Sequence, residues 1–387
     1  MNKYEERGVS AQKEDVHKAI KGLDKGLYPK AFCKILPDLV ANDDNYVNIM
    51  HADTAGTKTS LAYMYWKETG DMSVWKGVIQ DAIVMNIDDM ACVGCVDNIV
   101  LSSTIGRNKK QINGDIVAEL INGTSSFIQL MNSLDINIVL AGGETADVGD
   151  IVRTLDVGFT TFARLPKSKL VVNNIQDGDV IVGLSSSGQA SYETEYNGGM
   201  GSNGLTSARH DVFAHSYASK YPEAFDSNLS DDVVFTGSKE LTDTINVEGT
   251  DIPVAKLVLS PTRTYLPVIK QVLDKHHASI NGMIHCTGGA QTKVKKFIDN
   301  VKIIKDNLMD TPPLFQLIRE ESGTSMKEMF EVFNMGHRLE FYTDKETASE
   351  IIKISESYNI EAKIIGRVES HDKPCVEIHH EGEIFTY

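Results

Sequence analysis

The chain of 387 residues lacks the features that mark membrane, secreted and nucleic-acid-binding proteins. No apolar run approaches the length that spans a bilayer, and the first residues, MNKYEERGVS, hold no apolar core for a signal peptide. Basic residues are outnumbered, since 38 Lys and Arg face 54 Asp and Glu and give a formal net charge of −16. Such a surface repels nucleic-acid backbones and anionic membranes. We therefore expect a cytoplasmic protein whose partners include no nucleic acid and no membrane.

Cysteine is too scarce for a disulfide framework. The chain has five, an odd number, at scattered positions: Cys33, Cys92, Cys95, Cys286 and Cys375. The second and third form one C-x-x-C, but no further pair follows at zinc spacing and the flanking sequence is that of an apolar helix. We interpret these cysteines as buried structural thiols, not as zinc ligands or a redox pair.

The common nucleotide-binding fingerprints are absent as well. A Walker loop requires Gly directly before Lys, whereas Thr57 separates Gly56 from Lys58. The glycines within Gly199–Gly204 have G-x-G-x-x-G spacing, but they lie more than a dozen residues beyond the nearest predicted strand, which ends at Leu184. Any nucleotide site must therefore be assembled from separate segments. We expect the loop Gln189–Gly201 to be mobile without ligand and able to fold over one.

Composition and periodicity indicate a two-domain globular protein. Hydrophobic residues make up 41% and charged residues 24%, and no low-complexity tract interrupts the chain. Strand and helix patterns alternate in both halves and relax between residues 166 and 178. We predict an α/β (α+β) fold with mixed sheets and helices, divided into residues 1–172 and residues 173–387.

The element boundaries follow from the apolar spacing. Strands are expected at Tyr46–Met50, Ile99–Ser102, Ile136–Ala141, Thr154–Leu165, Asp179–Leu184, Asn281–Cys286, Arg338–Tyr342, Ala362–Glu369 and Val376–His379. Helices are expected at Val78–Met90, Ile112–Met131, Leu205–Val212, Lys293–Asp299, Ser325–Phe333 and Glu346–Tyr358. A further helix is expected to open at Pro261.

Three acidic segments carry the candidate chemistry: DTAGTK from Asp53, NIDDM from Asn86 and GGETAD from Gly142. The first combines a carboxylate, a glycine that lets backbone N–H groups approach an anion, and a lysine. In the second, Asp88 and Asp89 are neighbours, roughly 100° apart on a helix, so both are not expected to face one cavity equally. In the third, a strand running into two glycines places Glu144 where backbone can approach a ligand.

In this order, these segments resemble phosphoribosylformylglycinamidine cyclo-ligase, also called aminoimidazole ribonucleotide synthetase. The resemblance also rests on SSSG with a later SNG, on LSPTRTY, on TGG at Thr287–Gly289 and on FNMG at Phe333–Gly336. It implies a two-domain α/β fold, a homodimer built across amino-terminal strands, and ATP held in a cleft by the amino-terminal domain. The implied reaction is ATP-dependent closure of the imidazole ring in purine biosynthesis.

The resemblance also implies roles for individual residues. ATP and its phosphates would bind Asp53, Gly56, Thr57, Lys58, Gly142, Gly143 and Thr145. Magnesium would be held by Asp53, Asp89 and Glu144, with Asp88 as the second choice. Catalysis would depend on Lys58, Asp89 and Glu144. The phosphoribosyl substrate would contact Ser202, Asn203, Gly204, Arg263, Thr287, Gly288 and Gly289, although an arginine at the start of a helix is equally expected to form a structural ion pair.

The chain departs from the usual family pattern at three places. Asp88 replaces an asparagine, Asp147–Asp150 replaces Glu-Met-Pro-Gly, and Gly201 replaces the histidine of His-Ser-Asn-Gly after an apparent insertion. These departures keep two alternatives open. One is a sibling ATP-using enzyme of the same fold, such as a formylglycinamidine synthetase, selenophosphate synthetase or thiamine-phosphate kinase. The other is a non-catalytic nucleotide-binding protein.

If the metal carboxylates crowd together, removing one should relieve repulsion. Replacing Asp53, Asp89 or Glu144 by its amide is then expected to leave melting without Mg²⁺ unchanged or raised. The same replacements should abolish turnover and the stabilisation by Mg-ATP.

Overall fold

A computed structural model describes residues 3–9 and 14–387. Five strands form the first sheet in the order β1-β2-β5-β3-β4. They are β1 (Ile35–Pro37), β2 (Tyr46–Thr54), β3 (Ile99–Arg107), β4 (Ile138–Asp147) and β5 (Leu155–Pro166). Only β3 and β4 pair in parallel, so the sheet is mixed. Helices α3 (Lys58–Thr69), α4 (Val74–Ala91) and α5 (Gly114–Ser133) follow β2 and β3 in the chain.

Seven strands form the second sheet in the order β11-β13-β6-β14-β12-β15-β16. They are β6 (Val180–Ser185), β11 (Ile280–His285), β12 (Val301–Lys305), β13 (His337–Thr343), β14 (Ala362–Ser370), β15 (Cys375–His380) and β16 (Glu383–Thr386). Its helices are α6 (Leu205–Val212), α7 (Ser216–Lys220), α8 (Val254–Val258), α9 (Leu266–His276), α10 (Pro313–Ser322), α11 (Met326–Val332) and α12 (Lys345–Ser357). Two small hairpins complete the unit: β7 (Ser187–Gly188) with β8 (Asn197–Gly198), and β9 (Thr244–Val247) with β10 (Thr250–Pro253).

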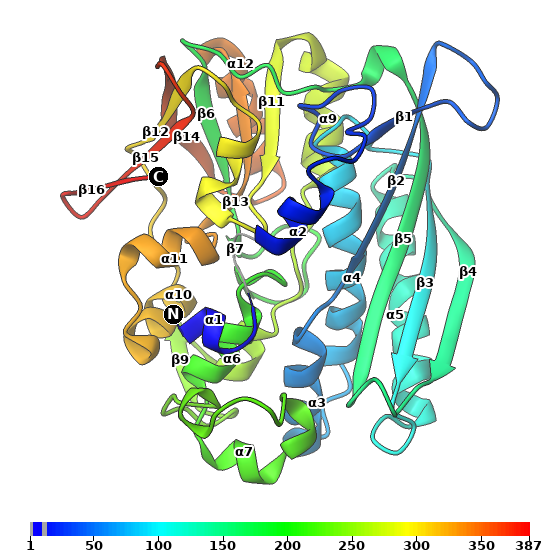
Figure 1. Cartoon of the computed structure of the whole chain (residues 1–387), viewed down its shortest axis with the longest axis vertical. Coiled ribbons are helices and arrows are strands. Elements are labelled where there is room, and N and C mark those ends of the chain that lie inside the picture. Colours follow the sequence, from blue (N-terminus) through cyan, green and yellow to red (C-terminus); the bar gives the residue numbers. More distant parts are fainter. Residues whose placement is uncertain (1–2, 10–13) are drawn as a thin grey trace.

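Helix α4 lies between the two sheets and is shared by both units (Figure 1). It is buried almost all round, including the side chains of Asp81, Asp88 and Asp89. An amphipathic helix on the surface of a protein buries only its apolar face. Because α4 is buried almost all round, other elements pack against it on every side. One of them is α9 of the second unit, whose preceding turn also contacts α4.

The fold is the two-domain mixed α/β architecture that the sequence predicts, with local differences. Strand β4 continues through GGETAD, and the register shift between β3 and β4 accommodates Gly142, whose φ is +100°. Glu144 therefore lies within a strand, not in a loop beyond it. The helix expected from Pro261 begins only at Leu266. Carboxylates of α4 accept the backbone N–H groups of Thr262 and Tyr265, which holds this stretch outside the helix.

The amino-terminal segment packs on the second unit. After α1 (Lys3–Glu6), the guanidinium of Arg7 lies 2.7 Å from Asp211 of α6 and donates to the carbonyl of Val233. All five cysteines are buried, as predicted, and no disulfide joins them. No helix in residues 3–9 or 14–387 combines the length and apolar character needed to cross a bilayer.

Candidate functional site

Asp89, near the carboxyl end of α4, lies where the two units meet. Its Oδ1 lies 2.7 Å from Nδ1 of His285, the last residue of β11. Its Oδ2 lies 3.5 Å from Nε2 of His51, which belongs to β2. The other ring nitrogen of His51 is 3.0 Å from Asn86 Oδ1, one turn earlier on α4. Histidines from two different sheets thus converge on one carboxylate.

The electrostatics of this site favour an ionised aspartate beside a neutral histidine. Burial alone would raise the pKa of Asp89, but the charge of Lys293 and the hydrogen bond to His285 outweigh it and lower that pKa. Burial lowers the pKa of His285 despite the opposing effect of Asp89. A neutral ring that donates Nδ1–H to Asp89 carries its lone pair on Nε2. That atom is buried and has no hydrogen-bond partner in the described part of the chain.

The TGG turn follows His285 directly and carries small polar groups. Lys293 Nζ donates to the hydroxyl of Thr287 and lies 4.4 Å from the centre of the Phe32 ring. Gly289 has a φ of +92°, which favours glycine at this position. A Cβ built at Gly288 would lie 3.6 Å from the side-chain amide nitrogen of Asn203. The structure therefore brings the predicted substrate segments SNG and TGG together.

Asp53 and Glu144, both predicted metal ligands, lie apart in this protomer. Asp53 pairs with the buried Phe159 on the sheet face that meets α4, and its carbonyl lies 3.5 Å from the Asn86 amide nitrogen. Glu144 is exposed on edge strand β4 and pairs with Thr104, whose side chain is exposed on the opposite face. Two strands, β3 and β5, separate β2 from β4, a span of roughly 14 Å at the usual strand spacing.

Lys58, predicted to bind phosphate, is fully buried in this structure. Its ammonium group lies 2.8 Å from Asp81 and 2.5 Å from the carbonyl of Ser260. Burial lowers its pKa against the effect of Asp81. The rest of DTAGTK is more open: Gly56 has a φ of +63° with free space around it, and Thr57 shares a hydrogen bond of 2.9 Å with Thr206 of α6.

Asp88 points away from Asp89, as the helical spacing predicts. It accepts hydrogen bonds from the hydroxyl of Thr264 at 2.6 Å and from the backbone N–H of Tyr265 at 2.9 Å. Burial raises the pKa of Asp88 to about 7, although these hydrogen bonds and the charge of Arg338 oppose the rise. In this structure the carboxyl group anchors the turn before α9.

This raised pKa predicts a pH-dependent stability. Because the folded pKa of Asp88 exceeds the unfolded value of about 4, its stabilising contribution is complete below that value and is lost as pH rises through about 7. Asp88→Asn can keep an acceptor for Tyr265 N–H and offer a donor to Thr264. We therefore expect the variant to gain in melting temperature relative to the native chain between about pH 5 and 8. Melting temperatures of the native chain and the variant across this pH range check the prediction. The control is Asp274→Asn at an exposed position. A difference in melting temperature between Asp88→Asn and the native chain that does not change with pH would contradict the prediction.

Two family models match the chain. The model described as "AIR synthase related protein, N-terminal domain" matches residues 36–165, and "AIR synthase related protein, C-terminal domain" matches residues 176–379. The chain belongs to the AIR synthase-related family. The phosphoribosylformylglycinamidine cyclo-ligase of Methanocaldococcus jannaschii is 30% identical over 328 residues, covering 84% of this chain and 79% of that protein. The enzyme of the same name from Methanococcus maripaludis strain C5 is 29% identical, covering 95% and 92%.

Solved structures share the AIR synthase-related fold. PurL of Thermotoga maritima in complex with FGAR has a TM-score of 0.53 at 12% identity, over 97% of this chain and 49% of that one. The HypE-HypF complex contains a chain with a TM-score of 0.54 at 13% identity, over 98% of this chain and 99% of that one. At this identity, both show the architecture alone.

Arg263 forms the structural ion pair that the sequence left open. It is fully buried, its Nη2 lies 2.6 Å from Glu193, and it donates to the carbonyls of Ser185, Ser187 and Gly188. Tyr192 also donates to the Thr264 carbonyl. Through these two contacts, the loop Gln189–Gly201 is held against the turn before α9. These contacts do not favour the predicted mobility.

The remaining predicted residues are placed as follows. Ser202 Oγ is buried without a partner among the described residues, and Gly204 packs so tightly that a Cβ there would lie 2.6 Å from the Phe333 ring. Gly142, Gly143 and Thr145 are exposed on edge strand β4. Strands β3 and β5 separate it from β2, which carries His51 beside Asp89. The four predicted metal ligands, Asp53, Asp88, Asp89 and Glu144, do not form a close group.

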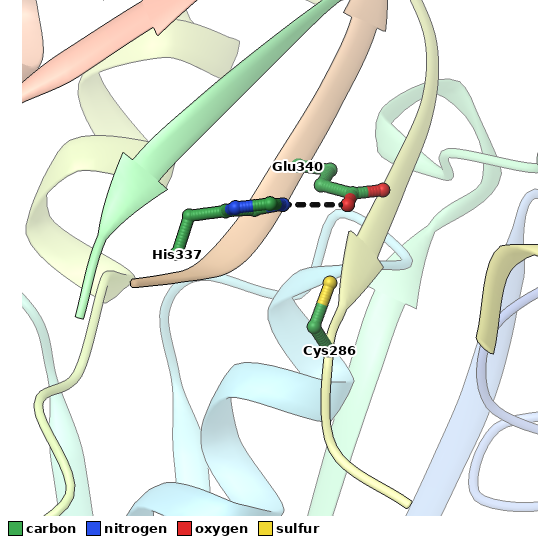
Figure 2. A group of neighbouring side chains, drawn as sticks. All are labelled: Cys286, His337 and Glu340. Carbon is green, nitrogen blue, oxygen red and sulfur yellow. Dashed lines mark hydrogen bonds and ion pairs between the residues drawn. The ribbon is translucent and has the colours of Figure 1, made fainter. Parts of the chain in front are cut away.

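Among the described residues, one group of metal-ligating side chains does lie close together: Cys286, His337 and Glu340 (Figure 2). It is fully buried, and Lys305 forms an ion pair with Glu340, which also bonds His337 at 2.9 Å and Tyr342 at 2.6 Å. Burial raises the pKa of the Cys286 thiol well above its ordinary value, which disfavours the thiolate that a metal needs. We interpret the group as a buried hydrogen-bond network.

Four residues of this candidate site were not predicted from the sequence: His51, Asn86, His285 and Lys293. His51 was within reach, because it lies two residues before Asp53 on an alternating strand and so shares its face. His285 directly precedes the CTGG segment, and Lys293 follows it by one helical turn. Asn86 is the first residue of the NIDDM segment, but its side chain is uncharged and gave no reason to select it as a site residue.

Proposed function

We propose that this chain closes the imidazole ring of aminoimidazole ribonucleotide, using formylglycinamidine ribonucleotide and ATP in purine biosynthesis. The shared name of its curated relatives, over most of their length, supports a ligase with this activity. The structural observation that carries the proposal is the Asp89–His285 pair beside the TGG turn, between two domains. PurL of Thermotoga maritima, solved with FGAR and with ADP, has the same fold.

The reaction needs an activated formyl oxygen, because an amide oxygen is a poor leaving group. The γ-phosphoryl group of ATP is transferred to that oxygen and ADP leaves. The ribose-bearing amidine nitrogen then attacks the formyl carbon, the ring closes, and the carbon–oxygen bond breaks with release of phosphate. The nitrogen must lose its proton on the way. The protein thus has to align two reactants, balance negative charge and accept one proton.

His285 is suited to accept that proton. Its Nε2 has no hydrogen-bond partner among the described residues, so the lone pair of that atom is available. Its Nδ1–H is held by Asp89, which stabilises the ring once it becomes positively charged. Asn203 and the TGG turn provide neutral donors beside it, and Lys293 supplies a cation for phosphate oxygens. We assign these groups to the phosphoribosyl substrate.

Magnesium fits part of the predicted ligand set. Mg²⁺ in nucleotide sites commonly binds one or two carboxylates and completes its shell with phosphate oxygens and water. Asp53 and Asp89 face the same inter-sheet space through β2 and α4, so these two would hold the ion. When bound, it would neutralise charge on the phosphoryl group. Glu144 does not belong to this set within one protomer.

ATP turnover that depends on formylglycinamidine ribonucleotide tests the proposal. The purified chain should form ADP, phosphate and aminoimidazole ribonucleotide in equal amounts only when both substrates are present. Glutamine with formylglycinamide ribonucleotide, selenide, or thiamine phosphate should not support consumption of ATP, measured as ADP or AMP. Turnover with one of these would establish a sibling activity instead, and ATP binding without any turnover would establish a non-catalytic nucleotide-binding protein.

We also propose that the chain forms a homodimer through the outer face of its first sheet. On this face Met50 pairs with Phe162, Phe162 with Val100, and Val100 with Val139. Met50 is 60% exposed and Val139 is 51% exposed, so the row of apolar side chains across four strands meets solvent in the protomer. A contiguous exposed apolar patch is typical of an interaction surface. The same face carries Glu144, which would then lie in the interface.

Sedimentation tests this arrangement. The native chain should sediment as a dimer at micromolar concentration, and Val100→Glu should sediment as a monomer because it places a charge in the centre of the row. Ile121→Glu, on the exposed side of α5 and 51% exposed in the native chain, is the matched control and should remain a dimer. A native monomer would contradict the proposal. The cytoplasmic location and the domain boundary at residues 172 and 173 remain predictions.

A further inference from the structure

Arg338 is a buried arginine without a counter-ion. It belongs to β13, which is buried along its whole length, and its side chain is 2% exposed. Its Nη2 donates to the carbonyl of Arg263 at 2.5 Å, and its guanidinium lies 5.4 Å from the centre of the Tyr265 ring. Its Nε and Nη1 have no acceptor among residues 3–9 and 14–387, and no carboxylate there forms an ion pair with it.

Such an arrangement is costly unless something completes it. A buried cation without a paired anion loses its hydration, and two unbonded N–H groups add to the loss. Two other fully buried cations of the second unit are paired, Arg263 with Glu193 and Lys305 with Glu340, whereas Arg209 of α6 is also buried without an ion pair among the described residues. Of Arg263, Lys305 and Arg338, only Arg338 has no carboxylate partner in the described part of the chain.

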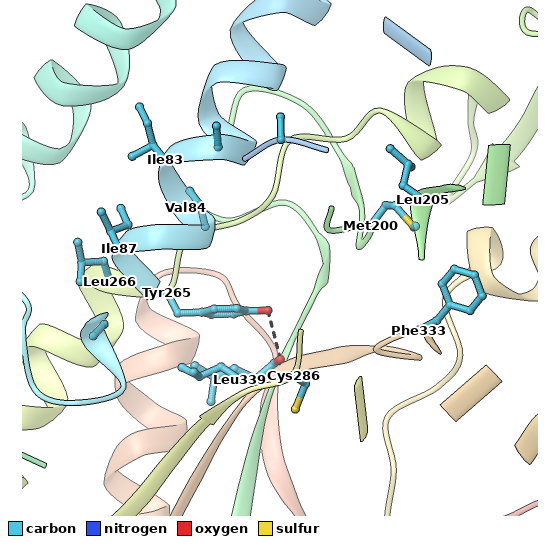
Figure 3. Close-up of a cluster of buried hydrophobic side chains, with 14 of the residues drawn as sticks. Ile83, Val84, Ile87, Met200, Leu205, Tyr265, Leu266, Cys286, Phe333 and Leu339 are labelled. Atoms are coloured by element: carbon cyan, nitrogen blue, oxygen red, sulfur yellow. Dashed lines mark hydrogen bonds between the residues drawn. The ribbon is translucent and has the colours of Figure 1, made fainter. Parts of the chain in front are cut away.

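The free side of Arg338 faces the SNG segment. A Cβ built at Gly201 would lie 3.7 Å from Arg338 Nη1. Because glycine has no side chain, the space that a side chain would fill here lies beside the guanidinium. Gly201, Asn203 and Arg338 line one small cavity, together with apolar side chains that include Met200, Cys286 and Phe333. Figure 3 shows these three apolar side chains within the buried hydrophobic cluster around them. Ser202 Oγ, next in the chain, is also buried without a partner.

We propose that Arg338 binds an oxyanion of the phosphorylated substrate in the space beside Gly201. On the side of Gly201 the guanidinium presents the unbonded Nη1, whose N–H groups are charge-assisted donors for an oxygen of a phosphoryl or phosphate group. Asn203 connects this space with the TGG turn through Gly288. Arg338 would thereby supply a permanent cation at the place where the usual family pattern carries a histidine. The identity of the substrate rests on the proposed function; the oxyanion site does not.

Binding requires the SNG segment to move. The cavity now encloses about 10 Å³, room for no more than one water molecule. The segment between Gly199 and Gly204 forms one wall, and these two glycines have φ values of +87° and +77°. Because glycine tolerates such angles and their alternatives alike, backbone rotation at both ends of the segment avoids the penalty that a Cβ would impose. The movement does expose Met200, which is buried in this structure. Oxyanion binding should thus displace Met200–Asn203 outward.

Inorganic phosphate serves as a probe that does not depend on catalysis. Phosphate at millimolar concentration should raise the melting temperature of the native chain more than sodium chloride at equal ionic strength. Arg338→Met should lose this rise. Arg209→Met is the matched control, because Arg209 is also buried, also has an unbonded Nε and lies on α6 outside the cavity; it should keep the rise. No rise in the native chain, or an equal rise in Arg338→Met, would overturn the proposal.

Kinetics provide a second measurement. Arg338→Met should lower kcat/KM for formylglycinamidine ribonucleotide about 100-fold, a typical effect of losing one oxyanion donor. Arg338→Lys keeps the charge and covers the case in which the methionine variant does not fold; it should fall between the two. Millimolar guanidinium should restore part of the activity of Arg338→Met, which a merely structural role would not allow.

The two proposals fail in different ways. If the native chain turns over ATP with formylglycinamidine ribonucleotide and Arg338→Met does so equally well, the oxyanion site is wrong and the proposed function stands. If the native chain shows no such turnover while phosphate stabilises it through Arg338, the oxyanion site stands and the function is wrong.

Discussion

Asp89→Asn is expected to abolish turnover and the stabilisation by Mg-ATP. The substitution removes the charge that holds His285 in the orientation with a free Nε2, and it removes one of the two carboxylates assigned to the metal. Loss of a group that orients a catalytic histidine commonly costs about 10⁴ in kcat. Single-turnover measurements and melting curves with and without Mg-ATP check this result. Asp274→Asn, on the exposed side of α9, is the control.

The same variant should melt at a lower temperature without ligand, contrary to the expectation from the sequence. That expectation assumed crowded carboxylates, whereas the structure surrounds Asp89 with His51, His285 and Lys293. Because its folded pKa is lowered, the contribution of Asp89 to stability is present above the unfolded pKa and is lost as pH falls through the folded value. A variant that melts at or above the native temperature near pH 7, or that retains its Mg-ATP shift, would show that Asp89 has another role.

Glu340→Leu is expected to produce the largest loss of stability. It leaves Lys305 buried without its counter-ion, and removal of one partner of a buried ion pair costs about 3–5 kcal/mol. Hydrogen bonds from His337 and Tyr342 are lost as well. Thermal unfolding should shift down by roughly 10 °C. Glu377→Leu, which removes a half-buried ion pair with Lys302 on the same sheet, is the control and should cost about 1 kcal/mol or less.

The double variant Lys305→Met with Glu340→Leu should be more stable than Glu340→Leu alone, because it leaves no unpaired charge in the core. Metal analysis distinguishes a hydrogen-bond network from a metal centre at this group. If the group with Cys286 and His337 held zinc, the purified protein would contain the metal in stoichiometric amount and chelation would lower its melting temperature. We expect neither.

The sequence predicted most elements because their apolar spacing is strong. Strand β2 alternates, α6 spans the predicted residues, and β13, β14 and β15 lie within one residue of their expected positions. Failures occurred where tertiary contacts override local signals. Pro261 resembles a helix opener, but carboxylates of α4, more than 170 residues earlier in the chain, capture the backbone that follows it.

The candidate site was harder to predict than the fold. The three acidic segments can be recognised in the sequence. The direction of each side chain, however, depends on its position along the strand or around the helix. Lys58 turns inward to Asp81, which lies 23 positions away on another helix, and no motif announces that pair. Glu144 falls on the opposite face of the sheet from Asp53 because of the register across β5 and β3. Only the assembled sheets decide these directions.

The shared helix α4 sets the order in which the chain can mature on the ribosome. Its three buried aspartates find their partners in the later half: Asp81 at Thr262, Asp88 at Tyr265 and Asp89 at His285. When only the first sheet has been synthesised, this helix therefore has one side open, and Asp88 and Asp89 lack these partners, whereas Asp81 can already pair with Lys58. The core of the first half closes after β11 has emerged, which leaves a long window in which the nascent chain presents α4 to chaperones.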